Sequence, residues 1–421
     1  MRSRSGSGIR RLAGGAPRRQ SGVALLALLT LIALTGMYQL LRQLNSVSHS
    51  VAREERAARA LAEARDALLG EAISAPKVVD AGYLLLPDAG VSFGGPKEGY
   101  ASGTPLGAAR DYSLAGKMPW RSLKIPPPRD RSSECLWYVL SGRFRNDVRT
   151  PVFNWDTSGQ LKVFDVAGNL VVDNVAVLII APGPALGGQD RTRATPGDPE
   201  FRECGDNYDA RNFLDPYDLA QAIGGRVNHF PGTPGNRVAS DAADKEFVLA
   251  NNAYYNDSFV AITPDEIFDR MIRRSDFAVA VGKLLDDPGL RNQATMIPVS
   301  SGPGKEKGTH DLDCSMASDP DTRDFCSNWK EMLFLTTLPT LAQITVDGQP
   351  TPPCARVLIF GGRRTAVQSR RTAADKSDPR NYLEGNNLLS FTVPVAVAPS
   401  FAGWSQFSYN YPERDLVRCL S

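Results

Sequence analysis

One segment gathers a histidine and several aspartates, side chains that could bind a metal ion: His310, Asp311, Asp313, Asp319, Asp321 and Asp324. Calcium is bound by several carboxylate and carbonyl oxygens of a loop, but the spacing here does not fit an EF-hand. Aspartates in a solvated loop give the same pattern. We therefore predict no metal site. Asp311, Asp313, Asp319 and Asp321 are kept as calcium candidates, and zinc is less favoured.

The spacings typical of common hydrolases and nucleotide-binding proteins are absent. The sequence contains no HExxH, GxSxG or P-loop pattern, and its three histidines are His49, His229 and His310. Ser300 and Ser301 lie near glycines and could join a Ser/His/Asp triad only if the fold brought such partners together. We therefore predict that the protein is not an enzyme and uses no cofactor.

Charge argues against a nucleic-acid partner, and cysteine usage favours disulfides. The net charge is +2, and six arginines precede residue 22, which leaves the remainder close to neutral. A nucleic-acid partner needs a clustered basic face, so we expect none. Six cysteines without a CxxC pair allow 15 disulfide pairings, with buried free thiols as the alternative. The six are Cys135, Cys204, Cys314, Cys326, Cys354 and Cys419.

The second half of the chain repeats features of the first half in the same order. The matched segments are Glu134–Tyr138 with Glu331–Phe334, 175–183 with 355–363, Gln189–Arg191 with Gln368–Arg370, and Asn212–Leu214 with Asn381–Leu383. The apolar runs predict buried strands, each leading through a glycine turn to a surface loop with Gln-x-Arg. Chance similarity of strands is the alternative to duplication. In each loop we expect the arginine to pair with an acid, with ligand contact as the alternative.

A short helix is predicted between the two halves, at 264–274. Thr263 can cap it, Pro264 suits its first turn, and arginines close it. Ile267, Met271 and Ile272 are expected to face the core.

The N-terminal region is organised around one apolar run, 22–41, which is long enough to span a bilayer. The preceding arginines favour a cytoplasmic N-terminus. No proline interrupts residues 39–74, and Leu44, Val47 and Leu61 belong to a narrow apolar stripe at helical spacing. The pattern predicts one helix over 23–74, roughly 78 Å long.

The junction Arg18-Arg19-Gln20-Ser21-Gly22, followed by VALLALLTLIAL, resembles the class III leader of type IV pilins and type II secretion pseudopilins. The resemblance implies cleavage by prepilin peptidase between Gly22 and Val23, and assembly with other pilin-like subunits through the N-terminal helix. Two positions depart from the family: Val23 replaces the usual Phe or Met, and Ala27 replaces a glutamate that neutralises a neighbour's N-terminal amine. The departure at Ala27 is typical of large minor subunits that initiate or cap a filament.

Four further segments resemble a pattern of large pilin-like proteins: Ala67–Ala72, Gly82–Asp88, Met118–Leu123 and Leu136–Val139. The expected fold is α+β, with the helix followed by a β-rich region of two duplicated lobes. The expected divisions are a cytoplasmic leader at 1–22, the helix at 23–74, and lobes at 76–240 and 241–421, with 76–421 folding without the helix.

The expected protein is a non-enzymatic minor pilin or pseudopilin of a type IV pilus or type II secretion-like assembly. It would cross the bacterial inner membrane once, with its bulk in the periplasm or in a surface filament. A membrane-anchored periplasmic enzyme or ligand-binding protein is the alternative.

Overall fold

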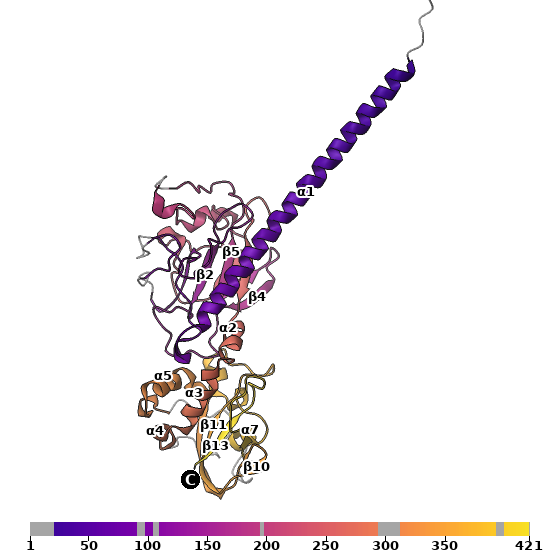
Figure 1. The fold of residues 1–421 in the computed structure, drawn as a ribbon. Coiled ribbons are helices and arrows are strands. Elements are labelled where there is room, and N and C mark those ends of the chain that lie inside the picture. The colour runs from indigo at the N-terminus through magenta and orange to yellow at the C-terminus, as the bar shows by residue number, and fades with distance from the viewer. Residues whose placement is uncertain are drawn as a thin grey trace, which may run out of the picture. The chain divides into compact units, whose positions relative to one another are not determined.

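The computed structural model describes residues 21–90, 97–103, 109–193, 198–293, 312–392 and 400–420. Its first element is α1 (Ser21–Ile73), an uninterrupted helix of 53 residues (Figure 1). The chain divides into two compact units, Met1–Glu55 and Arg56–Ser421. The second unit, called the head below, mixes helices with antiparallel and mixed sheets, which confirms the α+β prediction.

The C-terminal part of α1 belongs to the core of the head. Leu61, Ala64, Leu68, Leu69 and Ala72 are all nearly inaccessible to solvent and lie in the main hydrophobic cluster of the head. Their spacing of three and four residues places them on one helical stripe. The core of the head therefore includes residues from 57 onwards, N-terminal to the expected division at 76.

The end of α1 is fixed by a side chain from the middle of the chain. Arg274 donates hydrogen bonds to the backbone oxygens of Ile73 and Ala75, the latter at 2.9 Å. Helix C-termini leave carbonyl groups without intrahelical partners, and a cation there also suits the helix dipole. Pro76 follows and prevents the helix from continuing.

The first half of the head forms two sheets, with strand orders β1-β2-β5-β7 and β4-β3-β6. The strands are β1 (Asp111–Lys117), β2 (Trp137–Gly142), β3 (Leu161–Phe164), β4 (Leu170–Val175), β5 (Val177–Ala181), β6 (Lys245–Val248) and β7 (Ser258–Ile262). All neighbours are antiparallel except β3 and β6, which are parallel. Every residue of β2 and β5 is buried, and for β5 the apolar run at 175–183 predicts this.

The second half repeats this topology, with strand orders β8-β11-β13 and β10-β9-β12. The strands are β8 (Leu333–Ala342), β9 (Thr345–Val346), β10 (Gln349–Pro350), β11 (Cys354–Phe360), β12 (Ala402–Gly403) and β13 (Leu416–Leu420). In these two sheets β8, β11 and β13 take the places of β2, β5 and β7, and β10, β9 and β12 take the places of β4, β3 and β6. The pair β9 and β12 is parallel, as β3 and β6 are in the first half. We call β2–β7 the first copy and β8–β13 the second copy.

The predicted division at 240/241 does not coincide with the sheets. β6 and β7 lie after residue 240, yet they pair with β3 and β5 of the first copy. The first copy therefore closes at Ile262, and the helices that follow lie between the two copies in the sequence.

Those intervening helices are α2 (Pro264–Met271), α3 (Ser275–Asp286), α4 (Pro288–Arg291) and α5 (Pro320–Trp329); the second copy carries α6 (Ala373–Ser377) and α7 (Gly385–Thr392). α2 begins as predicted, since Thr263 and Glu266 form a capping box, and it ends at Met271 rather than 274. Ile267, Met271 and Ile272 are buried, as expected.

The cysteines form three disulfides, which confirms the expectation of an oxidised framework: Cys135–Cys204, Cys314–Cys326 and Cys354–Cys419. The first and third close loops of 69 and 65 residues. Such links stabilise a fold largely by restricting the unfolded chain.

The N-terminal half of α1 is described mainly by its backbone. In the parts of the chain that the structure describes, no helix combines the length and apolar composition that crossing a membrane requires.

Candidate functional site

The arginine side chains of the two Gln-x-Arg segments are largely buried, at 7% and 1% exposure, and make equivalent contacts. Arg191 donates to the backbone oxygen of Asn212 at 2.8 Å, and Arg370 donates to that of Asn381. Arg191 also contacts the carbonyl oxygen of Pro182, the first residue after β5, and Arg370 contacts that of Gly362, the second residue after β11. The middle residue of each motif, Asp190 or Ser369, is exposed, so the loops lie at the surface as expected. The expected pairing with an acid is also confirmed, since Arg191 lies 3.7 Å from Glu134 and Arg370 lies 3.2 Å from Asp156. Each arginine also ties its loop to the end of a central strand.

The glutamines of the two motifs are also equivalent. Gln189 accepts a hydrogen bond from the backbone N–H of Leu186, and Gln368 accepts one from that of Thr365, both at 2.9 Å. The side-chain N–H₂ of each glutamine then donates to a carboxylate: Gln189 to Asp215 at 3.0 Å and Gln368 to Glu384 at 2.7 Å. The repeat therefore extends to an acidic residue that directly follows Asn-Phe-Leu or Asn-Tyr-Leu.

A second acid completes a carboxyl pair in each copy. Asp257 directly precedes β7, and Asp415 directly precedes β13. An asparagine donates to each, Asn228 to Asp257 and Asn387 to Asp415, both at 2.8 Å.

The side chain of each of these asparagines also forms hydrogen bonds with both the N–H and the carbonyl group of one residue. Asn228 accepts from the N–H of Val248 at 3.0 Å and donates to its carbonyl at 3.2 Å. Asn387 does the same to Ala402, at 3.0 and 2.7 Å. The two carboxyl pairs therefore sit at equivalent places in the two copies.

The pair in the first copy is enclosed by protein groups. Asp215 is fully buried and accepts hydrogen bonds from the backbone N–H groups of Asn256 and Asp257 at 2.6 and 3.0 Å. Burial raises the pKa of Asp215 to about 6 and that of Asp257 well above its ordinary value, the latter also because Asp215 is adjacent. A pair of this kind retains a proton near neutral pH and serves as an internal hydrogen-bonded link.

The pair in the second copy opens onto a pocket of about 410 Å³. Glu384 is exposed, whereas Asp415 is 6% exposed and receives hydrogen bonds from Asn387 and from the backbone N–H of Gly362. Burial, and then the negative charge of Glu384, raise the pKa of Asp415 to about 7. At neutral pH the carboxyl group of Asp415 is therefore partly protonated and can both donate and accept hydrogen bonds.

Aromatic side chains and an arginine form the other wall of this pocket. Trp404 and Arg414 line it, and Arg414 lies between two rings, 4.2 Å from the centroid of Trp404 and 3.8 Å from that of Tyr411. Trp404 keeps 42% of its surface exposed and Tyr411 keeps 49%. In the part of the chain that the structure describes, no carboxylate or carbonyl oxygen binds this guanidinium, whose direction is fixed by the rings.

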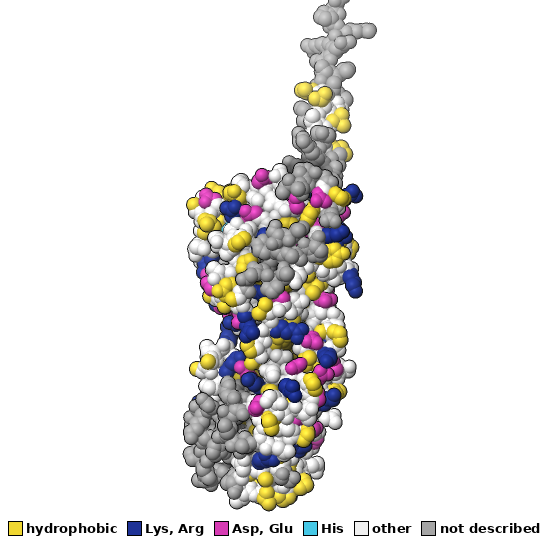
Figure 2. All heavy atoms as spheres, turned by 90° about the vertical axis from the view of Figure 1, so that its left-hand side faces the viewer, with side chains coloured by type: hydrophobic (Ala, Val, Ile, Leu, Met, Phe, Trp, Pro, Cys, Tyr) yellow, Lys and Arg dark blue, Asp and Glu magenta, His cyan; other side chains and the backbone are white. Residues whose placement is uncertain are grey.

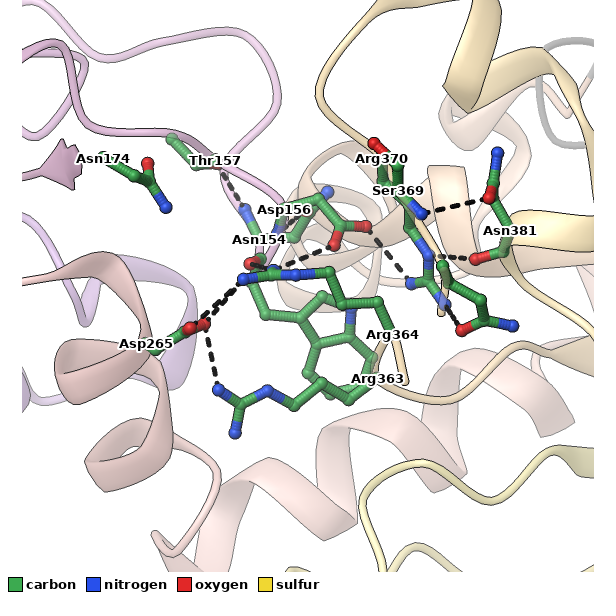
Figure 3. A network of polar contacts seen from close by, with 12 residues as sticks. Asn154, Asp156, Thr157, Asn174, Asp265, Arg363, Arg364, Ser369, Arg370 and Asn381 are labelled. Carbon is green, nitrogen blue, oxygen red and sulfur yellow. Dashed lines mark hydrogen bonds and ion pairs between the residues drawn. The ribbon is translucent and has the colours of Figure 1, made fainter. Parts of the chain in front are cut away.

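A separate polar network joins the two copies (Figure 3). Asp156 of the first copy lies between Arg370, at 3.2 Å, and Arg364, at 3.6 Å. Asp265 at the start of α2 faces Arg364 at 3.0 Å and Arg363 at 2.9 Å. The Asp156 side chain is fully buried and that of Arg370 is 1% exposed, so this contact is an internal ion pair with no route to a ligand.

A further buried cluster surrounds Lys117 in β1. Its ammonium group donates to the carbonyl of Gly205 at 2.9 Å, while Asp88 accepts from Tyr208 at 3.0 Å. Burial lowers the pKa of Lys117 to about 8 and raises that of Asp88 to about 6. Because these polar groups form hydrogen bonds with neighbouring backbone and side-chain groups, the cluster holds loops together.

The calcium candidates are not gathered at one place. Asp311, like His310, lies outside the described residues. Asp313 and Asp319 cap short helices by accepting from Ser315 and Thr322, and Asp321 pairs with Lys77 at 2.8 Å. Within the described ranges, no three acidic, histidine or cysteine side chains form a group that could hold a metal ion.

The other predicted positions are placed as follows. Gly22, Val23 and Ala27 lie in α1, but their side chains are outside what the structure describes, as are those of His49, Ser300 and Ser301. His229 is 2% exposed and lies 3.0 Å from the carbonyl oxygen of Pro216. Burial lowers its pKa to about 4, so it is neutral.

The carboxyl pairs were missed at the sequence level, although a signal existed. The repeat Asn-aromatic-Leu is followed by an acid in both copies, at Asp215 and Glu384, and the last strand of each copy is preceded by an aspartate. Extending the repeat by one residue would have found the first acid of each pair, and the aspartate before the last strand would have added the second. The exposed face in Figure 2 shows acidic and basic side chains interspersed.

Comparisons of the chain with protein-family models, with curated proteins and with solved structures gave no match. What the protein does is therefore inferred from its own residues.

Proposed function

We propose that this chain is a non-enzymatic minor subunit, similar to pilins and pseudopilins, that initiates or caps a filament of a type IV pilus or type II secretion-like assembly. It is made in the bacterial inner membrane, with its N-terminus cytoplasmic and its head on the periplasmic side. Prepilin peptidase removes residues 1–22, and the new N-terminus begins the assembly helix.

The observation that carries this proposal is the continuity of α1. The helix is continuous from Ser21, the first residue that the structure describes, into the core of the head. A cleaved secretion signal would leave no such helix on the mature protein, and a simple anchor would need no helical side chains in the core. In the pilin family, by resemblance, one helix serves both membrane and head.

The composition of α1 supports different roles for its two parts, the first in the membrane and the second in the head. The segment that begins at Val23 is apolar in sequence, while the part after Val51 alternates charged residues with the leucines and alanines that the head buries. An arginine of this second part, Arg65, pairs with Glu266 of α2. The second part is therefore fixed to the head, and the first part remains the element for membrane and neighbouring subunits.

Ala27 limits how this subunit joins a filament. In the family, a glutamate at this position attracts the N-terminal amine of the next subunit, an ion pair that is far stronger in a low-dielectric membrane than in water. A subunit with alanine cannot attract that amine, but its own amine can be received by another subunit. It should therefore be present once, at a filament end.

In purified filaments, the copy number of this chain should be a small fraction of that of the major subunit. Ala27→Glu should increase the copies incorporated or disturb assembly, because the helix would then attract a further subunit. Ala33→Glu, which adds the same charge elsewhere in the apolar segment, is the matched control and should not raise incorporation. Quantitative mass spectrometry of filaments measures the ratio. Finding this chain as the dominant repeating subunit would overturn the proposal.

A further inference from the structure

The two copies of the head share a scaffold but differ in what they present to solvent. In the first copy Asp215 is fully buried beneath hydrogen bonds from Gln189 and Asn256. In the second copy the equivalent acid, Glu384, is exposed at the edge of the 410 Å³ pocket. The first copy therefore shows what the scaffold requires for folding alone, and the second shows what has been added to it.

The additions can be identified by position. Asn228 bonds the backbone of Val248 in the first copy, and Asn387 bonds that of Ala402 in the second. Two residues further along the chain, the first copy has Ala250 and the second has Trp404. Directly before the second acid, the first copy has Asn256, whose side chain donates to Pro184 at 2.7 Å, and the second has Arg414. Both differences place a large side chain along the same pocket in the second copy, and Trp404 is 42% exposed there.

The charges of the pocket select the class of ligand. A cationic ligand would meet Arg414, and an anionic ligand would meet Glu384 and Asp415. A neutral ligand with several hydroxyl groups satisfies both walls, because a hydroxyl donates to a carboxylate and accepts from a guanidinium. Asn386, Thr345 and the exposed part of Trp404 supply further polar groups and a flat apolar surface.

We propose that this pocket binds a neutral sugar of a glycan, with a ring lying against Trp404 and its hydroxyl groups bonded to Glu384, Asp415 and Arg414. The volume falls within the range of small-ligand sites. The site goes beyond the proposed function and does not depend on it, since a head with this pocket would bind sugar whether or not α1 joins a filament.

The test uses the full-length protein in detergent on a printed array of neutral and acidic glycans, followed by calorimetric titration with the best neutral oligosaccharide. Neutral glycans should bind. Trp404→Ala and Arg414→Asn, which restore small or polar residues like those of the first copy, should each weaken binding at least tenfold. Glu384→Gln gives a third variant with little change in shape.

Tyr254→Ala is the matched control, since Tyr254 is 50% exposed and belongs to the first copy. It should bind like the parent protein, and thermal melting should show all four variants folded. The proposal is overturned if no neutral glycan binds, if only acidic glycans bind, or if folded Trp404→Ala and Arg414→Asn proteins bind as tightly as the parent. The N-terminal processing of the chain is unaffected by any of these outcomes.

Discussion

A truncated chain that begins at Pro76 should fail to form a stable head, whereas one that begins at Arg56 should fold. The shorter chain lacks Leu61, Leu68 and Leu69, which lie in the main core at 6%, 0% and 0% exposure. Burying a leucine contributes about 1.5–3 kcal/mol, so the three together contribute on the order of 5–9 kcal/mol. That is comparable to the whole stability of a typical domain, about 5–15 kcal/mol.

Both truncated chains should be exported to an oxidising compartment, so that the disulfides can form, and unfolded with urea. The chain from Arg56 should show one cooperative transition, and the chain from Pro76 should show none or one at much lower urea. In the full chain, Leu68→Ala should cost about 2–5 kcal/mol, while Glu63→Ala on the exposed side of α1 should cost little. A cooperative, equally stable head from Pro76 would show that α1 only leans on the surface.

Replacing Arg370 by methionine should destabilise the head far more than the same change at Arg191. Both guanidinium groups bond equivalent backbone oxygens, but Arg370 also pairs with Asp156, whose side chain is fully buried. The acid nearest to Arg191 is Glu134 at 3.7 Å, which is 33% exposed and can turn to water. Breaking a buried pair by removing one partner costs about 3–5 kcal/mol.

A double-mutant cycle separates the ion pair from the backbone contacts. Urea unfolding of Arg370→Met, Asp156→Asn and the double variant should give a coupling energy of about 1–3 kcal/mol. Arg191→Met combined with Asp156→Asn is the control, and its two effects should add. If Arg370→Met and Arg191→Met cost the same, and Arg370 shows no coupling to Asp156, the buried pair does not hold the two copies together.

Local signals in the sequence identified several parts of the fold correctly. Thr263 and Pro264 marked the start of α2, because capping depends on a few adjacent residues. The apolar runs at 175–183 and 355–363 marked β5 and β11, since a strand buried on both faces needs a continuous apolar sequence. An even number of cysteines in a region that was expected to be exported indicated disulfides.

Features that depend on distant partners could not be predicted in this way. Aligning Glu134 with Glu331 matches Trp137 with Phe334, and this match is wrong by one residue. Trp137 pairs with Ile180 of β5, and the residue of β11 that corresponds to Ile180 is Phe360. Phe360 pairs with Leu333, so Leu333 is the counterpart of Trp137. Register is set by both strands, so the similarity of one strand does not fix it.

The backbone contacts of the two Gln-x-Arg arginines were missed for a related reason. The acceptors of Arg191 are carbonyl groups of Pro182, Gly183, Asn212 and Phe213, which are brought together only by the folded chain. Backbone acceptors leave no mark on side-chain composition. The pocket of the second copy was missed in the same way, since Glu384 and Asp415 come from separate parts of the sequence.

The pilin-like assignment can be tested by the intact mass of the N-terminal peptide of the protein purified from membranes of cells with active prepilin peptidase. The mature chain should begin at Val23 with a methylated amine, and Gly22→Ala should retain the leader. A wild-type chain that keeps residues 1–22 in such cells would contradict the pilin-like assignment.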